Sequence, residues 1–449
     1  MALETSSLQQ EIGRIMNDGA KPISAHWESR IETPDGEVIP IKLLSLDIQR
    51  KYTENFTDHT ILSVVLGFGT FTHLVYPYKD NLTVLMTRRP LSENGEVLED
   101  VEISSRRYKA ILLTDSSEAL KNNVSTSGDK ETGDRGNIID VQFQLLDEAV
   151  EQVRLMSTGG VYTNAIPGNV VRHIVTELSA NIEVSDEDAV YGVDMVPPDN
   201  QTVREHIVIP HGTKVYDLPA YVQDMAGGIY NAGLGFYLQN SRWYLYPELA
   251  TNRFDQASKT LTVINVPPNR YSNIERTYRK TNNQTIILST GDVSHLDAGN
   301  IAQLNFGTGT RYTDPDRVLD GFGETKGNRT RLQRGQNNSE YQISQRDDGL
   351  VNAPVSTEGV TANPFTQASR LARRQGSYIQ LVWENSDPDA IYPGMPAKFM
   401  YLSEGEVMVF VGIVVGAQHY VHNTHKGLVV GTHRCNSAIA LFVTEETDL

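Results

Sequence analysis

The chain has 449 residues, of which 39% are hydrophobic and 21% charged, so it can form folded cores and is not a disordered polyampholyte; two to four domains are expected. Its 39 basic and 56 acidic residues give a formal net charge of −17, which disfavours a protein that binds free DNA or RNA. The single cysteine, Cys435, excludes an internal disulfide and a cysteine-based zinc site.

Residues 1–30 are predicted to be a polar arm. Leu8, Ile12 and Ile15 recur at helical spacing, so a short amphipathic helix is expected within it. Residues 31–136 are predicted to form a first tube-like β domain. Runs of β-branched and alternating apolar residues, separated by turn signals, indicate strands at 60–66, 71–76, 82–87 and 108–113.

Residues 137–204 are predicted to be a helix-containing connecting region. It opens on a strand at 141–145, and Asp147 is placed to cap a helix through Met156. A second helix is expected from Asn169, because the following apolar residues form one stripe: Val170, Val171, Ile174, Val175 and Leu178.

The rest of the chain is predicted to form three parts. Residues 205–310 form a mixed α/β domain, with a helix after Asp217 and an aromatic hairpin around 239–242. Residues 311–376, rich in Asn, Gly, Gln, Arg and Ser, form an extended arm or linker. Residues 377–449 form a small C-terminal β-barrel, or part of a second tube-like domain, with strands at 379–383, 397–402, 407–415, 428–430 and 438–443.

The fold class expected is therefore mainly β with an α+β insert. It combines tube-like β-sandwich or barrel domains with a small mixed α/β domain and a C-terminal small barrel. The N-terminus lacks a basic segment followed by an apolar core, and no apolar run approaches about 18 residues. We therefore expect neither a signal peptide nor a membrane insertion, and a protein assembled in a reducing cytoplasm.

Catalytic and phosphate-binding motifs are absent from the sequence, including Gly-x-Ser-x-Gly, His-Glu-x-x-His and a phosphate-binding loop. Asp314, Asp316 and Asp320 precede Gly321, but their spacing does not match a calcium-binding loop and favours a turn. The best metal candidate is a group of C-terminal histidines at 419, 422, 425 and 433. The alternative, which we favour, is that these are polar histidines of a strand end and loop.

Two acidic pairs, Glu384 with Asp387 and Asp186 with Asp188, could supply general acid and base chemistry. A chain with 56 acidic residues contains such pairs by chance, so we expect no enzyme and no cofactor. Arginines make the arm locally basic, which fits either a solvated segment or one lying on an acidic neighbour. They are Arg329, Arg331, Arg334, Arg370, Arg373 and Arg374.

An aromatic band marks the mixed domain. Aromatic side chains can dominate a protein interface, stack on sugars or fill a core, and we favour the core for most of the band. Its members are Tyr221, Tyr230, Phe236, Tyr237, Trp243, Tyr244 and Tyr246.

Two segments resemble the baseplate hub proteins of contractile-tailed bacteriophages. The first, 44–90, contains Tyr-Thr-Glu-Asn-Phe at 52–56, the strand at 60–66 and Tyr-Pro-Tyr-Lys-Asp-Asn-Leu at 76–82. The second, 206–247, contains Ile-Pro-His-Gly at 209–212, Leu-Pro-Ala-Tyr at 218–221, Gly-Ile-Tyr at 228–230, Gly233 and Trp-Tyr-Leu-Tyr-Pro at 243–247.

This resemblance implies a structural virion protein of the tail baseplate. Each subunit of such a hub contributes two tube-like domains, so a homotrimer forms a pseudo-sixfold ring between the hexameric tail tube and the central spike. Its implied partners are the tail tube protein, the central spike protein and the baseplate wedge proteins. Genomic DNA passes through without specific binding.

Eight residues are candidates for subunit interfaces: Leu62, Val64, Leu66, Tyr78, Trp243, Tyr246, Arg331 and Arg334. Two other functions remain open. The chain could be a different tail subunit (a tube, adaptor or wedge protein), or a glycan-binding or glycan-cleaving tail protein that uses the aromatic band and a carboxylate pair.

Overall fold

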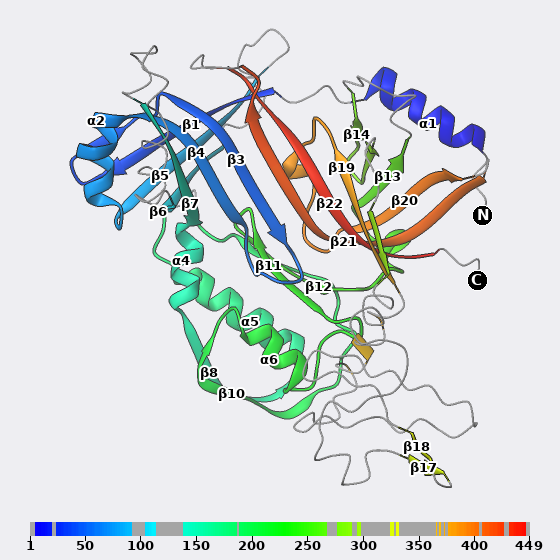
Figure 1. The fold of residues 1–449 in the computed structure, drawn as a ribbon. Coiled ribbons are helices and arrows are strands. Elements are labelled where there is room, and N and C mark those ends of the chain that lie inside the picture. Colours follow the sequence, from blue (N-terminus) through cyan, green and yellow to red (C-terminus); the bar gives the residue numbers. More distant parts are fainter. Residues whose placement is uncertain are drawn as a thin grey trace.

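The computed structural model describes residues 5–19, 24–91, 104–113, 138–185, 188–266, 276–289, 294–297, 324–326, 329–331, 365, 368–369, 372, 376–403, 406–425 and 431–445. Strands dominate it (Figure 1), which confirms the mainly β class. Most of the expected arm at 311–376 and the expected strand at 428–430 lie outside these residues. None of the helices in the described ranges is long and apolar enough to cross a membrane.

A closed ring of eight strands forms a first barrel. Antiparallel pairing runs β3–β4–β7–β6–β5–β1–β22–β21 and returns to β3. The strands are β1 (Ser24–Thr33), β3 (Lys42–Lys51), β4 (His59–Gly67), β5 (Leu82–Leu91), β6 (Ser104–Leu112), β7 (Ile138–Asp147), β21 (Glu406–Asn423) and β22 (His433–Glu445), and β2 (Gly36–Val38) pairs with β1. Alternate residues such as Leu62, Val64 and Phe143 fill the interior of the barrel.

A second barrel uses the same two C-terminal strands. Pairing runs β15–β13–β20–β21–β22–β19. The two ends, β15 and β19, are linked by a side chain and not by a paired ladder in the described residues: the Ser289 hydroxyl donates to the Val382 carbonyl at 2.8 Å. The added strands are β13 (Thr260–Asn265), β15 (Gln284–Ser289), β19 (Ser377–Trp383) and β20 (Pro396–Ser403), flanked by β14 (Tyr278–Lys280) and β16 (Ser294–Asp297).

The β21–β22 hairpin is therefore shared by both barrels. Residues of β21 up to Ile413 pair with β20, whereas those from Gly416 onward pair with β3, and the register shifts between Val414 and Gly416. At Gly412 an added Cβ would lie 2.2 Å from the Phe442 carbonyl oxygen, so a residue without a side chain lets the two strands approach closely. Among the strands of 377–445, β21 and β22 thus belong to both barrels and β19 and β20 to the second alone. The domain boundaries expected from the sequence stay predictions.

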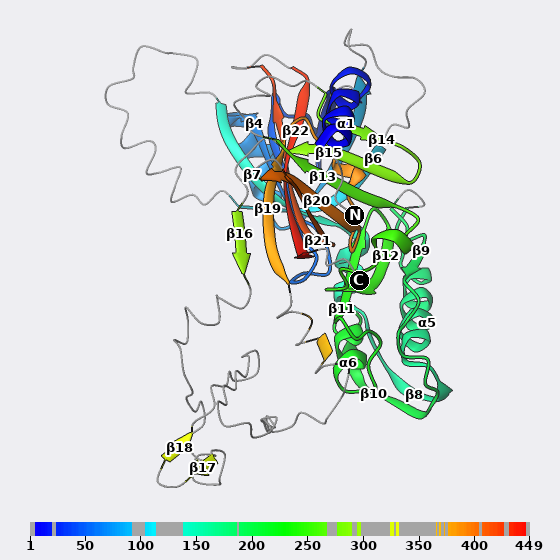
Figure 2. The same ribbon diagram turned by 90° about the vertical axis from the view of Figure 1, so that its right-hand side faces the viewer.

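The mixed α/β region lies beneath the barrels (Figure 2). Strands β8 (Ser157–Ala165) and β10 (Arg204–Lys214) form one sheet, and β11 (Leu234–Gln239), β12 (Arg242–Pro247) and β9 (Gly192–Met195) form another. Helices α4 (Glu148–Leu155), α5 (Pro167–Ala180) and α6 (Leu218–Asp224) share a core with both sheets. Short elements elsewhere in the described residues are η4 (Phe254–Gln256), η6 (Pro388–Ala390), β17 (Glu324–Lys326) and β18 (Arg329–Arg331).

Several local predictions are confirmed. The N-terminal helix is α1 (Thr5–Asp18), and its Leu8, Ile12 and Ile15 pack against β13 and β15 of its own chain. The Asp147 side chain caps α4 by accepting from the Ala149 amide at 3.0 Å. Asp217 precedes α6 as expected, but its side chain makes no capping hydrogen bond.

The strand predicted at 71–76 is wrong. The chain is helical there, through α2 (Phe68–Thr70), η1 (Phe71–Val75) and η2 (Tyr76–Tyr78). Phe71 and Val75 are its buried residues, a spacing of four that fits a helical turn and not the alternation of a strand. Pro77 lies in the first turn of η2, where a missing amide hydrogen is tolerated. In Figure 1, this segment and α1 lie at opposite sides of the molecule.

Candidate functional site: the junction between the barrels

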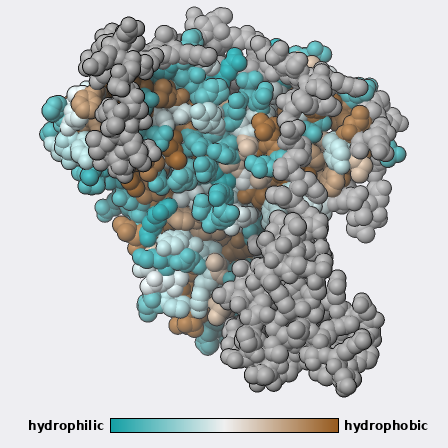
Figure 3. All heavy atoms as spheres, viewed as in Figure 1, coloured by the Kyte–Doolittle hydropathy of each residue, from teal (hydrophilic) through white to brown (hydrophobic). Residues whose placement is uncertain are grey.

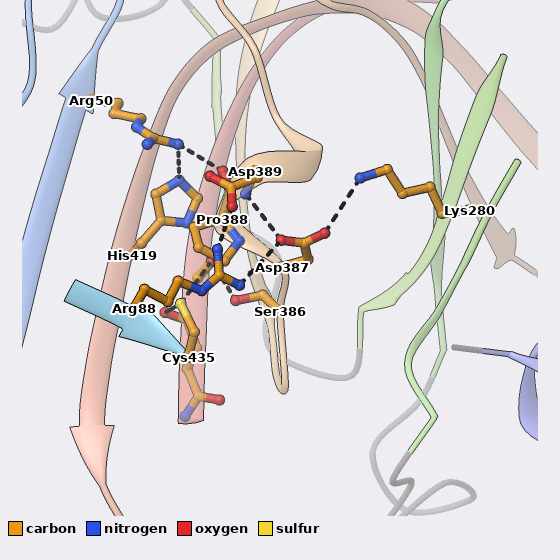
Figure 4. Close-up of polar contacts among 11 residues, drawn as sticks. Arg50, Arg88, Lys280, Ser386, Asp387, Pro388, Asp389, His419 and Cys435 are labelled. Atoms are coloured by element: carbon orange, nitrogen blue, oxygen red, sulfur yellow. Dashed lines mark hydrogen bonds and ion pairs between the residues drawn. The ribbon is translucent and has the colours of Figure 1, made fainter. Parts of the chain in front are cut away.

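A buried polar cluster, which we call the junction, joins the two barrels (Figure 4). Arg50, on the inward side of β3, is only 3% exposed. It donates from Nε to Asp58 at 3.1 Å and from Nη1 to the Pro388 carbonyl at 2.7 Å. Its Nη1 also lies 3.1 Å from His419 Nε2 on β21. One guanidinium of the first barrel thus holds both the shared hairpin and the segment after β19.

The contact with Arg50 fixes the tautomer of His419. A guanidinium can only donate, so Nε2 accepts, and Nδ1 carries the proton that is donated to the Ser437 hydroxyl at 2.6 Å. Burial, and then the Arg50 charge, lower the pKa of His419 well below its ordinary value. The Ser437 hydroxyl lies 2.6 Å from the Ser386 hydroxyl, and the Ser386 backbone amide donates to the Cys435 carbonyl at 2.8 Å.

Cations from two other strands hold the same segment after β19. Arg88 on β5 pairs with Asp389 and lies 4.0 Å from the Asp387 carboxylate. Lys280 on β14 lies 3.4 Å from the other oxygen of Asp387. Each carboxylate of the segment therefore faces at least one cation, which makes 386–389 a bridge between the barrels.

A cavity of about 580 Å³ opens beside the junction. Three arginines line it, and each contacts a carboxylate: Arg50 with Asp58, Arg88 with Asp389 and Arg106 with Asp147. The wall is thus charge-compensated, and its ion pairs connect strands and loops of different parts of the chain. The arrangement holds those parts in a fixed relation.

The four candidate histidines are held by separate partners. His433 lies 3.3 Å from the Leu43 carbonyl through Nε2, and its Nδ1 accepts from the Trp27 amide at 3.4 Å. His425 contacts Thr424, and His422 stacks on Tyr420. Within the described ranges, no group of three or more His, Cys, Asp or Glu is placed to hold a metal ion.

The acidic pairs and the aromatic band also have structural contacts. Asp387 faces cations, and Asp188 accepts from the Ser185 hydroxyl at 2.7 Å, while Asp186 lies outside the described residues. Five aromatic residues of the band are buried, which confirms the core interpretation for most of it: Tyr230, Phe236, Tyr237, Trp243 and Tyr246.

The interface candidates divide by burial. Buried in the chain's own cores are Leu62, Val64, Leu66, Trp243 and Tyr246. The Tyr78 hydroxyl donates to Asp35 at 2.5 Å. Arg331 ends β18, its side chain is not described, and Arg334 lies outside the described residues. The role of all eight residues in an interface stays a prediction.

Acid is expected to weaken the fold through His433. Burial lowers the pKa of His433 from 6.5 to about 4. Between these values the unfolded imidazole binds a proton and the folded one does not, so stability falls as the pH is lowered. We expect the urea midpoint to fall less between pH 7 and pH 5 in His433→Gln than in the wild type. Equal falls in both proteins would contradict this assignment.

No family model matches the chain, and no curated protein matches it. Among solved structures, a 43 kDa tail protein of prophage MuSo2 from Shewanella oneidensis is similar over 94% of this chain and 99% of its own, with 10% identity and a TM-score of 0.42. A PdpA–VgrG complex is similar over 96% and 67%, with 9% identity and a TM-score of 0.35. The E. coli c3393 protein, described as a type VI secretion component similar to the phage T4 tail proteins gp27 and gp5, is similar over 91% and 74%, with 6% identity and a TM-score of 0.39. None of these TM-scores establishes a shared fold.

Proposed function

We propose that this chain is the hub of a phage-type tail baseplate, a non-enzymatic virion protein that closes into a ring of three copies. The observation that carries the proposal is that one chain holds two barrels through a shared hairpin. Three copies then supply six barrels, which matches a ring to a sixfold tube on one side and a threefold spike on the other.

The junction supports this role, because a ring wall requires barrels that do not turn relative to each other. Arg50 links β3 to β21 and to the segment after β19 through hydrogen bonds. Arg88 on β5 and Lys280 on β14 form ion pairs with the same segment. A buried network with these partners specifies one arrangement. The proposed neighbours are the tail tube, central spike and wedge proteins, with DNA passing through the ring, and assembly takes place in the host cytoplasm.

The mass of the purified protein in solution tests the proposal. Light scattering after size exclusion is expected to give three times 49.9 kDa, or about 150 kDa. The same mass after a tenfold dilution would show a stable trimer and not a weak, transient association. A hexamer or an open polymer would point to a tube protein, and a monomer at every concentration would point to a wedge-like subunit.

A further inference from the structure

The outer surface of the first barrel differs in charge from one side to the other. Strands β1, β5 and β6 form one side, and its exposed arginines are paired with carboxylates. Arg30 lies 3.6 Å from Glu37, Arg89 lies 3.1 Å from Glu28, and Arg107 lies 3.3 Å from Glu32. This is an ordinary solvated surface with both signs of charge interspersed.

The opposite side, formed by β21, β3, β4 and β7, carries what we call the neutral face. The strand register aligns its outward side chains in three rows across the strands. The rows are His422, Ser45, Ser63 and Gln142; Tyr420, Asp47, Ile61 and Gln144; and Gln418, Gln49 and His59. None of these positions is Lys or Arg, and Asp47 is the single carboxylate among them.

Hydrogen bonds and ring contacts hold the neutral face together. The Asp47 carboxylate accepts from the Gln49 amide at 3.1 Å and from the Gln418 amide at 3.0 Å. The rings of Tyr420 and His422 are stacked with centroids 5.8 Å apart. The one charge is therefore engaged within the sheet, and the surface offers amides, hydroxyls and rings.

The neutral face continues into the second barrel. On β22, Asn436 is the partner of Tyr420 and Ala438 the partner of Gln418, and Val382 on β19 is in turn the partner of Ala438. Three charged residues stand at its borders. Exposed Arg434 on β22 is the partner of His422, and exposed Asp140 precedes Gln142 on the outward side of β7. The third, Lys51, lies 2.9 Å from Glu54. A single six-stranded surface, β7–β4–β3–β21–β22–β19, thus spans both barrels. In Figure 1 the shared strands run between the two sides of the molecule.

A wall of this kind suits the passage of DNA. Lysine and arginine bind backbone phosphates and would hold the duplex, whereas a surface with cations only at its borders lets it slide. On the side of the molecule drawn in Figure 3, hydrophobic residues occur in small groups among hydrophilic ones. We propose that the neutral face lines the channel of the ring and faces the double-stranded DNA that moves through it. The inference rests on the proposed hub function.

Lysine substitutions test which side faces the channel. The variant Ser63→Lys with Gln144→Lys adds two cations to the neutral face of each chain, and Thr83→Lys with Thr87→Lys adds two to the outward side of β5. Once light scattering has shown that each protein is a trimer, its affinity is measured for a linear duplex and for a covalently closed circle of the same sequence. Only the linear duplex can thread a closed ring.

We expect the neutral-face variant to bind the linear duplex at least about tenfold more tightly than the circle in low salt, because its added cations are reached through the channel. The β5 variant should bind both DNAs equally. Equal binding of both DNAs by the neutral-face variant, or binding of neither, would overturn the inference and leave the trimer standing. A wild-type protein that is not a trimer would remove the hub proposal itself.

Discussion

Replacing Arg50 with methionine should lower the free energy of unfolding by about 3–5 kcal/mol, the usual effect of removing one partner of a buried ion pair. Arg50 is 3% exposed, and its guanidinium serves three acceptors: Asp58, the Pro388 carbonyl and His419. Without it, the Pro388 carbonyl and His419 Nε2 lose their donor inside the protein. Among the described residues, Asp58 keeps only the Tyr237 hydroxyl, which donates to it at 2.9 Å. Equilibrium unfolding in urea, followed by circular dichroism, measures the change.

Arg30→Met is the matched control. Arg30 also lies on a strand of the first barrel and pairs with a glutamate, Glu37, but its side chain is 45% exposed. An exposed pair of this kind contributes at most about 1 kcal/mol. If Arg50→Met cost no more than Arg30→Met, the junction would not be what holds the barrels together.

Arg50→Lys separates charge from geometry. Lysine keeps the positive charge, but its compact ammonium lacks the planar fork that reaches acceptors in several directions. The free energy of unfolding of the Arg50→Lys variant should lie between those of the wild type and the methionine variant. The fraction of protein found at the trimer mass should decrease in the same order, from wild type to Arg50→Lys to Arg50→Met. The reason is that barrels free to rotate against each other would form the ring less readily.

The sequence predicted most elements whose cause is local. The spacing of Leu8, Ile12 and Ile15 defines α1, and Asp147 defines the start of α4. The hairpin at 239–242 follows from Asn240 and Ser241, which adopt φ of 48° and 60° at its turn. Each of these signals lies within a few residues of the structure that it specifies.

The barrel closure could not be predicted in the same way. It joins Ala25 to His433 and Lys51 to Gly416, pairs separated by most of the chain, and no short-range pattern records such a contact. The shared hairpin was hidden for the same reason, since β21 extends to Asn423 while its apolar run ends at Val415.

The junction corresponds to a weak pattern in the sequence that was not used in the predictions. Leu46, Ile48 and Arg50 fall on the same side of β3, and Ala417, His419 and Val421 on the same side of β21. A charged or polar residue at an inward position of a strand indicates a buried partner, although the partner itself comes from another part of the chain. The sequence favoured polar histidines of a strand end and loop over metal ligands, whereas His419 is buried within β21 and accepts from an arginine.

Replacing Trp243 with alanine should destabilise the protein by about 3–5 kcal/mol, as for other buried tryptophans. Trp243 is fully buried in the core of the mixed region, where its ring stacks on Phe236 with centroids 4.5 Å apart and its Nε1 donates to the Ser179 hydroxyl at 2.9 Å. Removing the ring leaves a cavity between β12 and α5 and an unpaired hydroxyl.

Tyr191→Ala provides the comparison for this prediction, because Tyr191 is aromatic and 66% exposed. Its loss should change the unfolding free energy by no more than about 0.5 kcal/mol.

The two variants also distinguish a core role from a carbohydrate-binding role for Trp243. A sugar-stacking platform must present its ring to solvent, and Trp243 does not. If Trp243→Ala instead kept the wild-type urea midpoint and lost binding to a surface glycan, the band would be a carbohydrate site. A lowered midpoint would support the interpretation of Trp243 as a core residue.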